Sequence, residues 1–156
     1  MTKLLVIAHA PLASSLKAVA VHVFPDAERV LEALDVSYEA SLEEVETAAR
    51  EIIDRQADEV LIFTDVFGAT PSNVALRLAE GGRIRVVTGV NVPMLWRVLC
   101  YSNEPLDAVV ERALGGGAQG IMQIAAAKPT TKPSSTSSRT EGGIDTSRVH
   151  PPSANK

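Results

Sequence analysis

Residues 4–11 have the sequence Leu-Leu-Val-Ile-Ala-His-Ala-Pro, and this stretch decides the fold. A continuous apolar run of strand length, followed by a proline and a new helical period, is typical of the first βα unit of a parallel sheet. His9 is then expected at the carboxyl end of the first strand, where open α/β sheets bind their ligands. A functional role and a simple turn-capping role for His9 are equally compatible with that position.

Three further apolar runs predict the remaining strands of the sheet. We expect them over residues 30–36, 60–65 and 84–88. The run at 60–65 is the most apolar of the three, which predicts a central strand, and it ends on the carboxylate of Asp65. Helical periods separate the runs, and residues 121–124 offer a short fifth strand. The sequence therefore predicts an α/β domain of three layers, with a mostly parallel open sheet of four strands flanked by helices.

Short signals predict where individual helices begin and end. Pro11 is expected as the first helical residue, and the Ser-Leu-Glu-Glu stretch 41–44 has the capping-box pattern. Thr70 followed by Pro71 predicts an N-cap and a first-turn proline. Gly115–Gly117 predict a helix stop. Gly115, Gly117 and Gly120 also match G-x-G-x-x-G, but a dinucleotide site needs a strand before the glycines and a helix after them, which is the reverse of this order.

Composition limits the classes of function. Residues 1–127 contain seventeen acidic and ten basic side chains, and this acidic balance argues against nucleic acid as the main partner. Cys100 is the single cysteine, so there is no intrachain disulfide and no thiolate metal cluster. The N-terminal apolar run is too short for a signal peptide, and no apolar run reaches transmembrane length. We therefore expect a cytoplasmic protein.

Residues 128–156 have a different composition from the rest of the chain. Eleven of these twenty-nine residues are Ser or Thr and four are Pro. Such a segment buries too little apolar surface to offset the entropy lost on ordering. We expect one folded domain over residues 1–127 and a disordered tail over residues 128–156.

The residues that carry chemistry are His9, Asp65 and the loop 68–73. A histidine accepts a phosphoryl group when one ring nitrogen is free to attack and the other is held as N–H by an acceptor. Asp65, at the end of a neighbouring central strand, is the natural acceptor, and it would stabilise the positive charge that develops on the ring. The start of the next helix supplies N–H donors for the phosphoryl oxygens, aided by the hydroxyls of Thr70 and Ser72. For Asp65 and Thr70 the alternative is a turn-capping role.

Three segments together resemble a known family. His9 at its strand end, the stretch Asp-Val-Phe-Gly-Ala-Thr-Pro-Ser-Asn at 65–73, and Gly-Val-Asn-Val-Pro-Met-Leu at 89–95 are similar to the IIA component of the mannose family of the bacterial phosphoenolpyruvate-dependent sugar phosphotransferase system. The resemblance covers about residues 1–125. It implies a homodimeric phosphocarrier in which the fifth strand, residues 121–124, is swapped across the dimer.

The resemblance also implies partners and roles. His9 would take a phosphoryl group from phospho-HPr and pass it to a IIB component in sugar uptake, with Asp65 orienting the ring so that Nε2 is the nucleophile. Gly68, Thr70, Ser72 and Asn73 would bind the phosphate, and no metal or other cofactor is needed. Two departures from the family pattern are the Ala8-His9-Ala10-Pro11 context, where members commonly have small polar or glycine residues, and the Ser/Thr/Pro-rich tail in place of a IIB domain.

Two other functions remain compatible with the sequence. In the first, phosphorylation of His9 is a regulatory signal and no sugar is transported by a dedicated partner. In the second, the chain is a receiver-like or ligand-binding α/β module without phosphohistidine. Asp65 favours the second interpretation superficially, but a receiver has acidic residues after its first strand, where this chain has His9. The sequence leaves the sugar open.

Overall fold

The structure is a computed structural model that describes residues 1–56, 59–79 and 81–127. The chain divides into two units, Met1–Gln123 and Ile124–Lys156, and the helices and strands of the described residues belong to the first. The predicted disordered tail, residues 128–156, lies outside the described residues. The division of the chain into a domain over residues 1–127 and a tail therefore stays a prediction.

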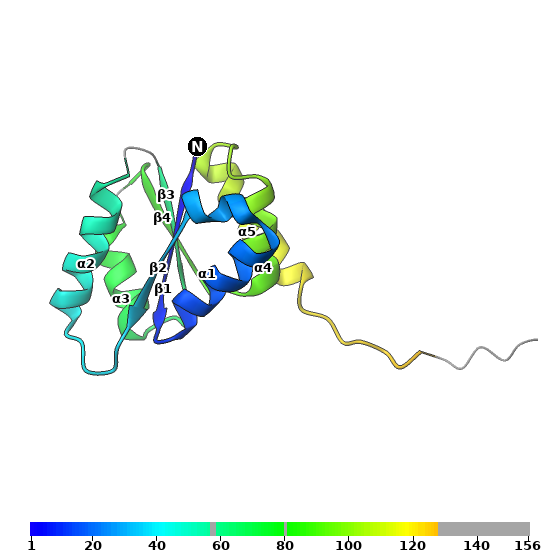
Figure 1. Cartoon of the computed structure of the whole chain (residues 1–156), viewed down its shortest axis with the longest axis horizontal. Helices are drawn as coiled ribbons and strands as arrows, with labels where there is room; N and C mark the ends of the chain where they lie inside the picture. Colours follow the sequence, from blue (N-terminus) through cyan, green and yellow to red (C-terminus); the bar gives the residue numbers. More distant parts are fainter. Residues whose placement is uncertain (57–58, 80, 128–156) are drawn as a thin grey trace, which may run out of the picture. The chain divides into compact units, whose positions relative to one another are not determined.

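The first unit is a four-stranded parallel sheet with helices on both faces (Figure 1). The strand order is β2-β1-β3-β4. The strands are β1 (Lys3–His9), β2 (Leu31–Val36), β3 (Val60–Thr64) and β4 (Ile84–Thr88). The helices are α1 (Leu12–Val23), the 3-10 helix η1 (Pro25–Arg29), α2 (Leu42–Asp54), α3 (Thr70–Leu78), α4 (Val92–Cys100) and α5 (Leu106–Gln119). The predicted architecture of three layers around a parallel sheet is confirmed.

Strand β1 lies at the centre of the sheet because its side chains are apolar on both faces. It pairs in parallel with β2 and with β3, so that Leu4 lies opposite Leu31 and Leu61. Every residue of β3 is buried, as expected for an uninterrupted apolar strand. Strand β2 is an edge strand and only its two end residues are buried. The two central strands therefore deliver His9 and Asp65 to the same edge of the sheet.

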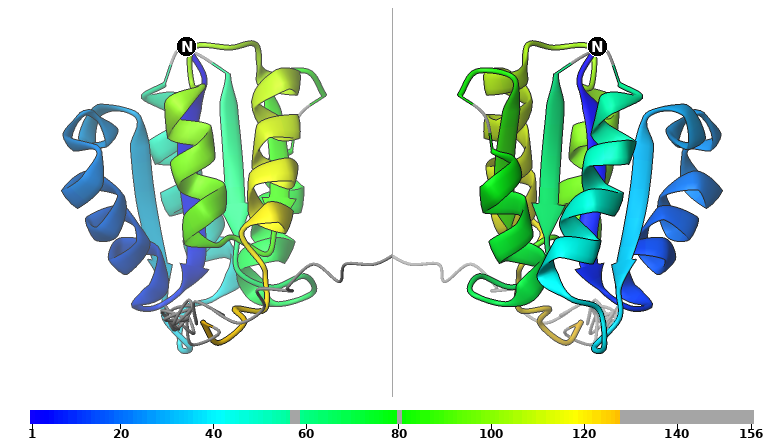
Figure 2. Two further views of the ribbon diagram at one scale, coloured as in Figure 1. Left: turned by 90° about the vertical axis from the view of Figure 1, so that its right-hand side faces the viewer. Right: turned by 90° about the vertical axis from the view of Figure 1, so that its left-hand side faces the viewer.

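The side chains of β1 point alternately to the two faces of the sheet and so contribute to two separate layers of the core. Leu4 and Val6 pack in one cluster with residues of α1, α4 and α5, whereas Leu5 and Ile7 pack in the other with residues of α2 and α3. Figure 2 shows these two sets of helices on opposite faces of the sheet. Since both faces are covered by helices, residues at the carboxyl ends of the central strands are accessible at the edge of the sheet.

Two predicted helix starts are displaced by one residue. Pro11 is the N-cap of α1 instead of its first helical residue, and Thr70 is the first residue of α3 instead of its N-cap. Ala69 takes the N-cap position of α3 with an extended backbone and no side-chain hydrogen bond. The predicted capping box is confirmed, because the Ser41 hydroxyl accepts from the Glu44 N–H and the Glu44 carboxylate accepts from the Ser41 N–H.

The predicted helix stop at Gly115–Gly117 is wrong, since α5 continues through all three glycines to Gln119. A Cβ atom at Gly116 would lie 2.6 Å from Cβ of Arg97, and one at Gly117 would lie 2.7 Å from Cε of Met94. Both partners belong to α4. The glycines therefore permit close packing of two helices, and this requirement is invisible in a pattern that considers one helix at a time.

Residues 121–127 contain no helix or strand, so the predicted fifth strand is not formed within the single chain. A short strand needs a neighbour for its backbone hydrogen bonds, and in the expected dimer that neighbour belongs to a second copy. The swapped strand thus remains a prediction. Among the described residues, no helix is long and apolar enough to cross a membrane.

Candidate functional site

His9 and Asp65 form a hydrogen-bonded pair at the carboxyl edge of the sheet. Oδ2 of Asp65 lies 2.6 Å from Nδ1 of the His9 ring and accepts a second hydrogen bond, at 2.9 Å, from the His9 backbone N–H. The Asp65 side chain is 12% exposed and the His9 side chain 30% exposed. One carboxylate oxygen thus binds both the backbone N–H and one ring nitrogen of the histidine, and the ring stays accessible to a partner.

The charge of Asp65 determines which nitrogen of His9 carries a proton. Burial raises the pKa of Asp65, but hydrogen bonds from the His9 backbone, the His9 ring and the Val66 N–H outweigh burial and hold that pKa below its usual value. An ionised carboxylate only accepts hydrogen bonds, so Nδ1 of His9 is the donor. In the neutral ring the lone pair is then on Nε2. The pair therefore leaves Nε2 as the ring nitrogen with a free lone pair.

The loop after Asp65 turns sharply into helix α3. Gly68 adopts a φ of +88°, which side chains other than glycine rarely permit. Its N–H donates to the buried Ser72 hydroxyl at 2.9 Å, and the Asn73 amide donates to the Gly68 carbonyl at 3.5 Å. Ser72 and Asn73 therefore shape the loop, and Asn73 is also exposed. The hydroxyl of Thr70 makes no hydrogen bond within the described part of the chain.

The strands β1 to β4 are each followed by a helix that starts at this edge. In three of these helices, a side-chain oxygen accepts a hydrogen bond from a backbone N–H of the first turn. The Ser14 N–H of α1 donates to the Asp35 carboxylate at 3.0 Å. Helix α2 has its capping box, and the Met94 N–H of α4 donates to Oδ1 of Asn91 at 2.9 Å. Within the described residues, α3 has no side-chain cap. Its positive end is therefore available to an anion.

Two residues near the site were not predicted from the sequence. The Tyr38 ring lies against His9, with ring centroids 5.7 Å apart and planes at 30°. Asp35, on the edge strand β2, caps α1 immediately after the His9 loop. Both come at or after the carboxyl end of β2, so strand-end position, the signal that identified His9, would also have identified them. Apolar side chains are also exposed next to Asp65, with Val66 52% and Phe67 74% exposed.

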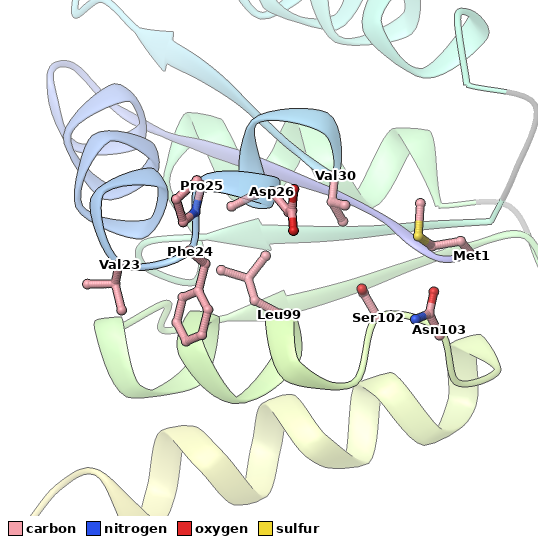
Figure 3. A pocket seen from close by; sticks show the side chains of 10 residues that line it. Met1, Val23, Phe24, Pro25, Asp26, Val30, Leu99, Ser102 and Asn103 are labelled. Atoms are coloured by element: carbon pink, nitrogen blue, oxygen red, sulfur yellow. The ribbon is translucent and has the colours of Figure 1, made fainter.

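A cavity lies at the other end of the sheet, away from His9. It is lined by apolar side chains of the α1 end, of η1 and of α4, including Phe24, Pro25 and Leu99, together with Ser102 (Figure 3). Met1 and Val30, which precede β1 and β2, also line it. This cavity therefore lies at the amino edge of the sheet and is separate from the His9 site.

The fold and the site together define a class of protein. It is an open parallel α/β domain that presents a histidine, oriented by a carboxylate, beside an uncapped helix start at the carboxyl edge of its sheet. The model of a family described as PTS system fructose IIA component matches residues 3–114, and the chain belongs to this family. It is thus a IIA component of a sugar phosphotransferase system, which favours the phosphotransferase interpretations over a receiver-like module.

Solved structures with this fold come from several phosphotransferase systems. A phosphotransferase system component EIIA from Streptococcus agalactiae is 25% identical, has a TM-score of 0.69, and covers 79% of this chain and 97% of its own. The mannose/sorbose-specific IIA subunit from Enterococcus faecalis shares the fold with a TM-score of 0.74 at 22% identity, covering 83% of this chain and 98% of its own. No protein of curated function matches the sequence significantly.

Proposed function

We propose that this chain is a cytoplasmic phosphocarrier that accepts a phosphoryl group from phospho-HPr on Nε2 of His9 and donates it to a IIB component during sugar uptake. The observation that carries this proposal is the 2.6 Å contact between Nδ1 of His9 and Oδ2 of Asp65, because it leaves Nε2 as the nucleophile. Membership of the IIA family supplies the reaction class.

The chemistry is a transfer between two histidines. Nε2 of His9 attacks phosphorus, the P–N bond of the donor breaks, and its electron pair returns to the donor imidazole. The His9 ring becomes positively charged while Asp65 stays ionised beside Nδ1, which stabilises the charge where it develops. Donation to the acceptor is the same step with His9 as the leaving group. Such an exchange is nearly balanced in energy, so alignment and exclusion of water are the main tasks of the protein.

The phosphoryl oxygens are bound at the start of α3. At the starts of α1, α2 and α4 a side-chain oxygen accepts from a backbone N–H, whereas the start of α3 has no side-chain cap among the described residues. Thr70 and Ser72 lie in its first turn. Gly68 and Asn73 hold the loop that brings this turn to the sheet edge. We assign the phosphate cradle to Gly68, Thr70, Ser72 and Asn73.

The carrier acts as a homodimer in which residues 121–124 form a strand against the partner's sheet. Supporting this proposal, Ile121 is 77% exposed and Met122 70% exposed in the single chain, and both would be covered by such pairing. Sedimentation of the full chain should give a dimer, and Ile121→Asp should shift the equilibrium toward monomer. A monomer at micromolar concentration for the unmodified chain would contradict the dimer.

Intact mass after incubation with phosphoenolpyruvate, enzyme I and HPr tests the phosphocarrier. We expect one acid-labile phosphate on the wild type, none on His9→Ala, and one on His22→Ala. His22 is a matched control because it is an exposed histidine on α1. An unphosphorylated wild type beside phosphorylated HPr would overturn the proposal. Labelled protein that passes no phosphate to any IIB component would favour the regulatory alternative.

A further inference from the structure

Tyr38 lies in the tight turn between β2 and α2, and its ring faces the His9 ring. The two centroids are 5.7 Å apart and the planes are inclined by 30°, a tilted arrangement within the distance at which aromatic rings interact. The Tyr38 side chain is nevertheless 88% exposed. A large apolar ring that is this exposed gains little from burial, so packing into the core does not explain its position.

The turn itself does not need the Tyr38 ring. It is closed by the Ala40 N–H, which donates to the Ser37 carbonyl at 3.2 Å, and by the Glu39 N–H, which donates to the Ser37 hydroxyl at 3.3 Å. The side chain of residue 38 takes part in neither bond. The Tyr38 ring is therefore not needed for the turn and is available to contact the neighbouring imidazole.

We propose that Tyr38 is a positioning residue for His9, holding the plane of the imidazole for in-line transfer and covering one of its faces. This inference rests on the proposed function, in which Nε2 of His9 carries the phosphoryl group. Asp65 binds the ring at Nδ1, and a single hydrogen bond leaves the ring free to tilt about that point. An aromatic ring against the face of the imidazole restrains this tilt.

A contact on the ring face is compatible with phosphoryl transfer. The nitrogen lone pair lies in the plane of the imidazole, so donor and acceptor approach Nε2 along that plane and not across the face. Phosphohistidine is lost wastefully when a water oxygen attacks phosphorus, the P–N bond breaks with its electron pair returning to Nε2, and inorganic phosphate leaves with the protons of water. Tyr38 reduces access of water from one side and keeps the bond aligned for the productive partner.

The test compares Tyr38→Ala, Tyr38→Phe and Glu39→Ala with wild type in three measurements. NMR of the unphosphorylated protein reads the ring-current shift on the His9 ring protons, which needs no phosphate. The rate of single-turnover transfer from phospho-HPr reports how well the His9 ring is aligned. The decay rate of the isolated phosphoprotein reports how fast water hydrolyses the phosphohistidine. Tyr38→Phe keeps the ring, and Glu39→Ala alters the adjacent exposed position of the same turn.

We expect Tyr38→Ala to move the His9 ring protons downfield, to slow transfer by about two- to tenfold, and to shorten the phosphohistidine lifetime by a similar factor. Tyr38→Phe and Glu39→Ala should resemble wild type in all three measurements. A phosphorylated wild type whose transfer rate and lifetime are unchanged in Tyr38→Ala overturns this inference alone. A wild type that accepts no phosphate overturns the proposed function and this inference together.

Discussion

One oxygen atom of Asp65, Oδ2, binds His9 twice, at 2.9 Å from its backbone nitrogen and at 2.6 Å from its ring nitrogen Nδ1. The backbone bond fixes where the histidine leaves β1, and the ring bond fixes its tautomer. The second carboxylate oxygen, Oδ1, accepts the Val66 N–H at 2.8 Å and so holds the carboxylate itself. His9, the proposed nucleophile, is thus oriented by a group whose own position is fixed by the loop after β3.

Asp65→Asn should slow phosphoryl transfer strongly while preserving the fold. The amide oxygen still accepts a hydrogen bond, but the variant lacks the negative charge that stabilises the positively charged ring. A hydrogen bond to a charged group contributes about 1.5–3 kcal/mol, so we expect a loss of roughly 10- to 150-fold in single-turnover rate. Glu39→Gln, which also removes one exposed carboxylate, should transfer at the wild-type rate. Equal rates for Asp65→Asn and wild type would exclude an orienting role for Asp65.

Acid should remove the stabilisation that the ionised Asp65 provides. Because hydrogen bonds hold the folded-state pKa of Asp65 below its unfolded value, its contribution is fully present above the unfolded pKa and is lost as pH falls through the folded pKa. The difference in unfolding free energy between wild type and Asp65→Asn should therefore shrink as the pH falls below about pH 4. Urea unfolding at pH 5 and pH 3 measures it, and a difference that grows between these two pH values would contradict this sign.

The parallel sheet and the proximity of His9 to Asp65 could both be predicted from the sequence, and for the same reason. Continuous apolar runs such as residues 4–8 and 60–63 are buried on both faces only in the centre of a parallel sheet, and parallel strands end at a common edge. Residues that end two neighbouring central strands must then be close in space. This inference needs no knowledge of side-chain packing.

Features that depend on packing between elements were not predictable in this way. Gly116 is a helix breaker by propensity, but in the structure it lies inside α5 because α4 approaches too closely for a Cβ atom. The position of Tyr38 after a strand end could have marked this residue, but its contact with the His9 ring depends on how the turn after β2 packs. A fifth strand at 121–124 lacks a neighbour in a single chain, so the chain alone does not decide its structure.

The two hydroxyls of the α3 start should respond differently to mutation. Ser72 accepts the Gly68 N–H at 2.9 Å and is 2% exposed, so Ser72→Ala should lower the free energy of unfolding by about 0.5–1.5 kcal/mol. Thr70 makes no side-chain cap to α3, so Thr70→Ala should leave stability within about 0.5 kcal/mol of wild type and slow phosphoryl transfer. Chemical denaturation measures the stability of the two variants, and single-turnover transfer measures their rates of phosphoryl transfer. A stability loss confined to Thr70→Ala would reverse these assignments.

Adjacent glycines of α5 provide the sharpest test of how α4 and α5 pack. A Cβ atom at Gly115 would have nothing within 4 Å, so Gly115→Ala should raise the free energy of unfolding by about 0.5–1 kcal/mol through helix propensity alone. Gly116→Ala gains the same propensity but places its methyl group 2.6 Å from Cβ of Arg97, a backbone-anchored atom that moves only with α4. Overpacking costs about 1–3 kcal/mol, which exceeds the gain, so Gly116→Ala should be destabilised. Urea unfolding of the two variants measures the difference, and equal stabilisation of both would mean that α4 and α5 lie farther apart than in this structure.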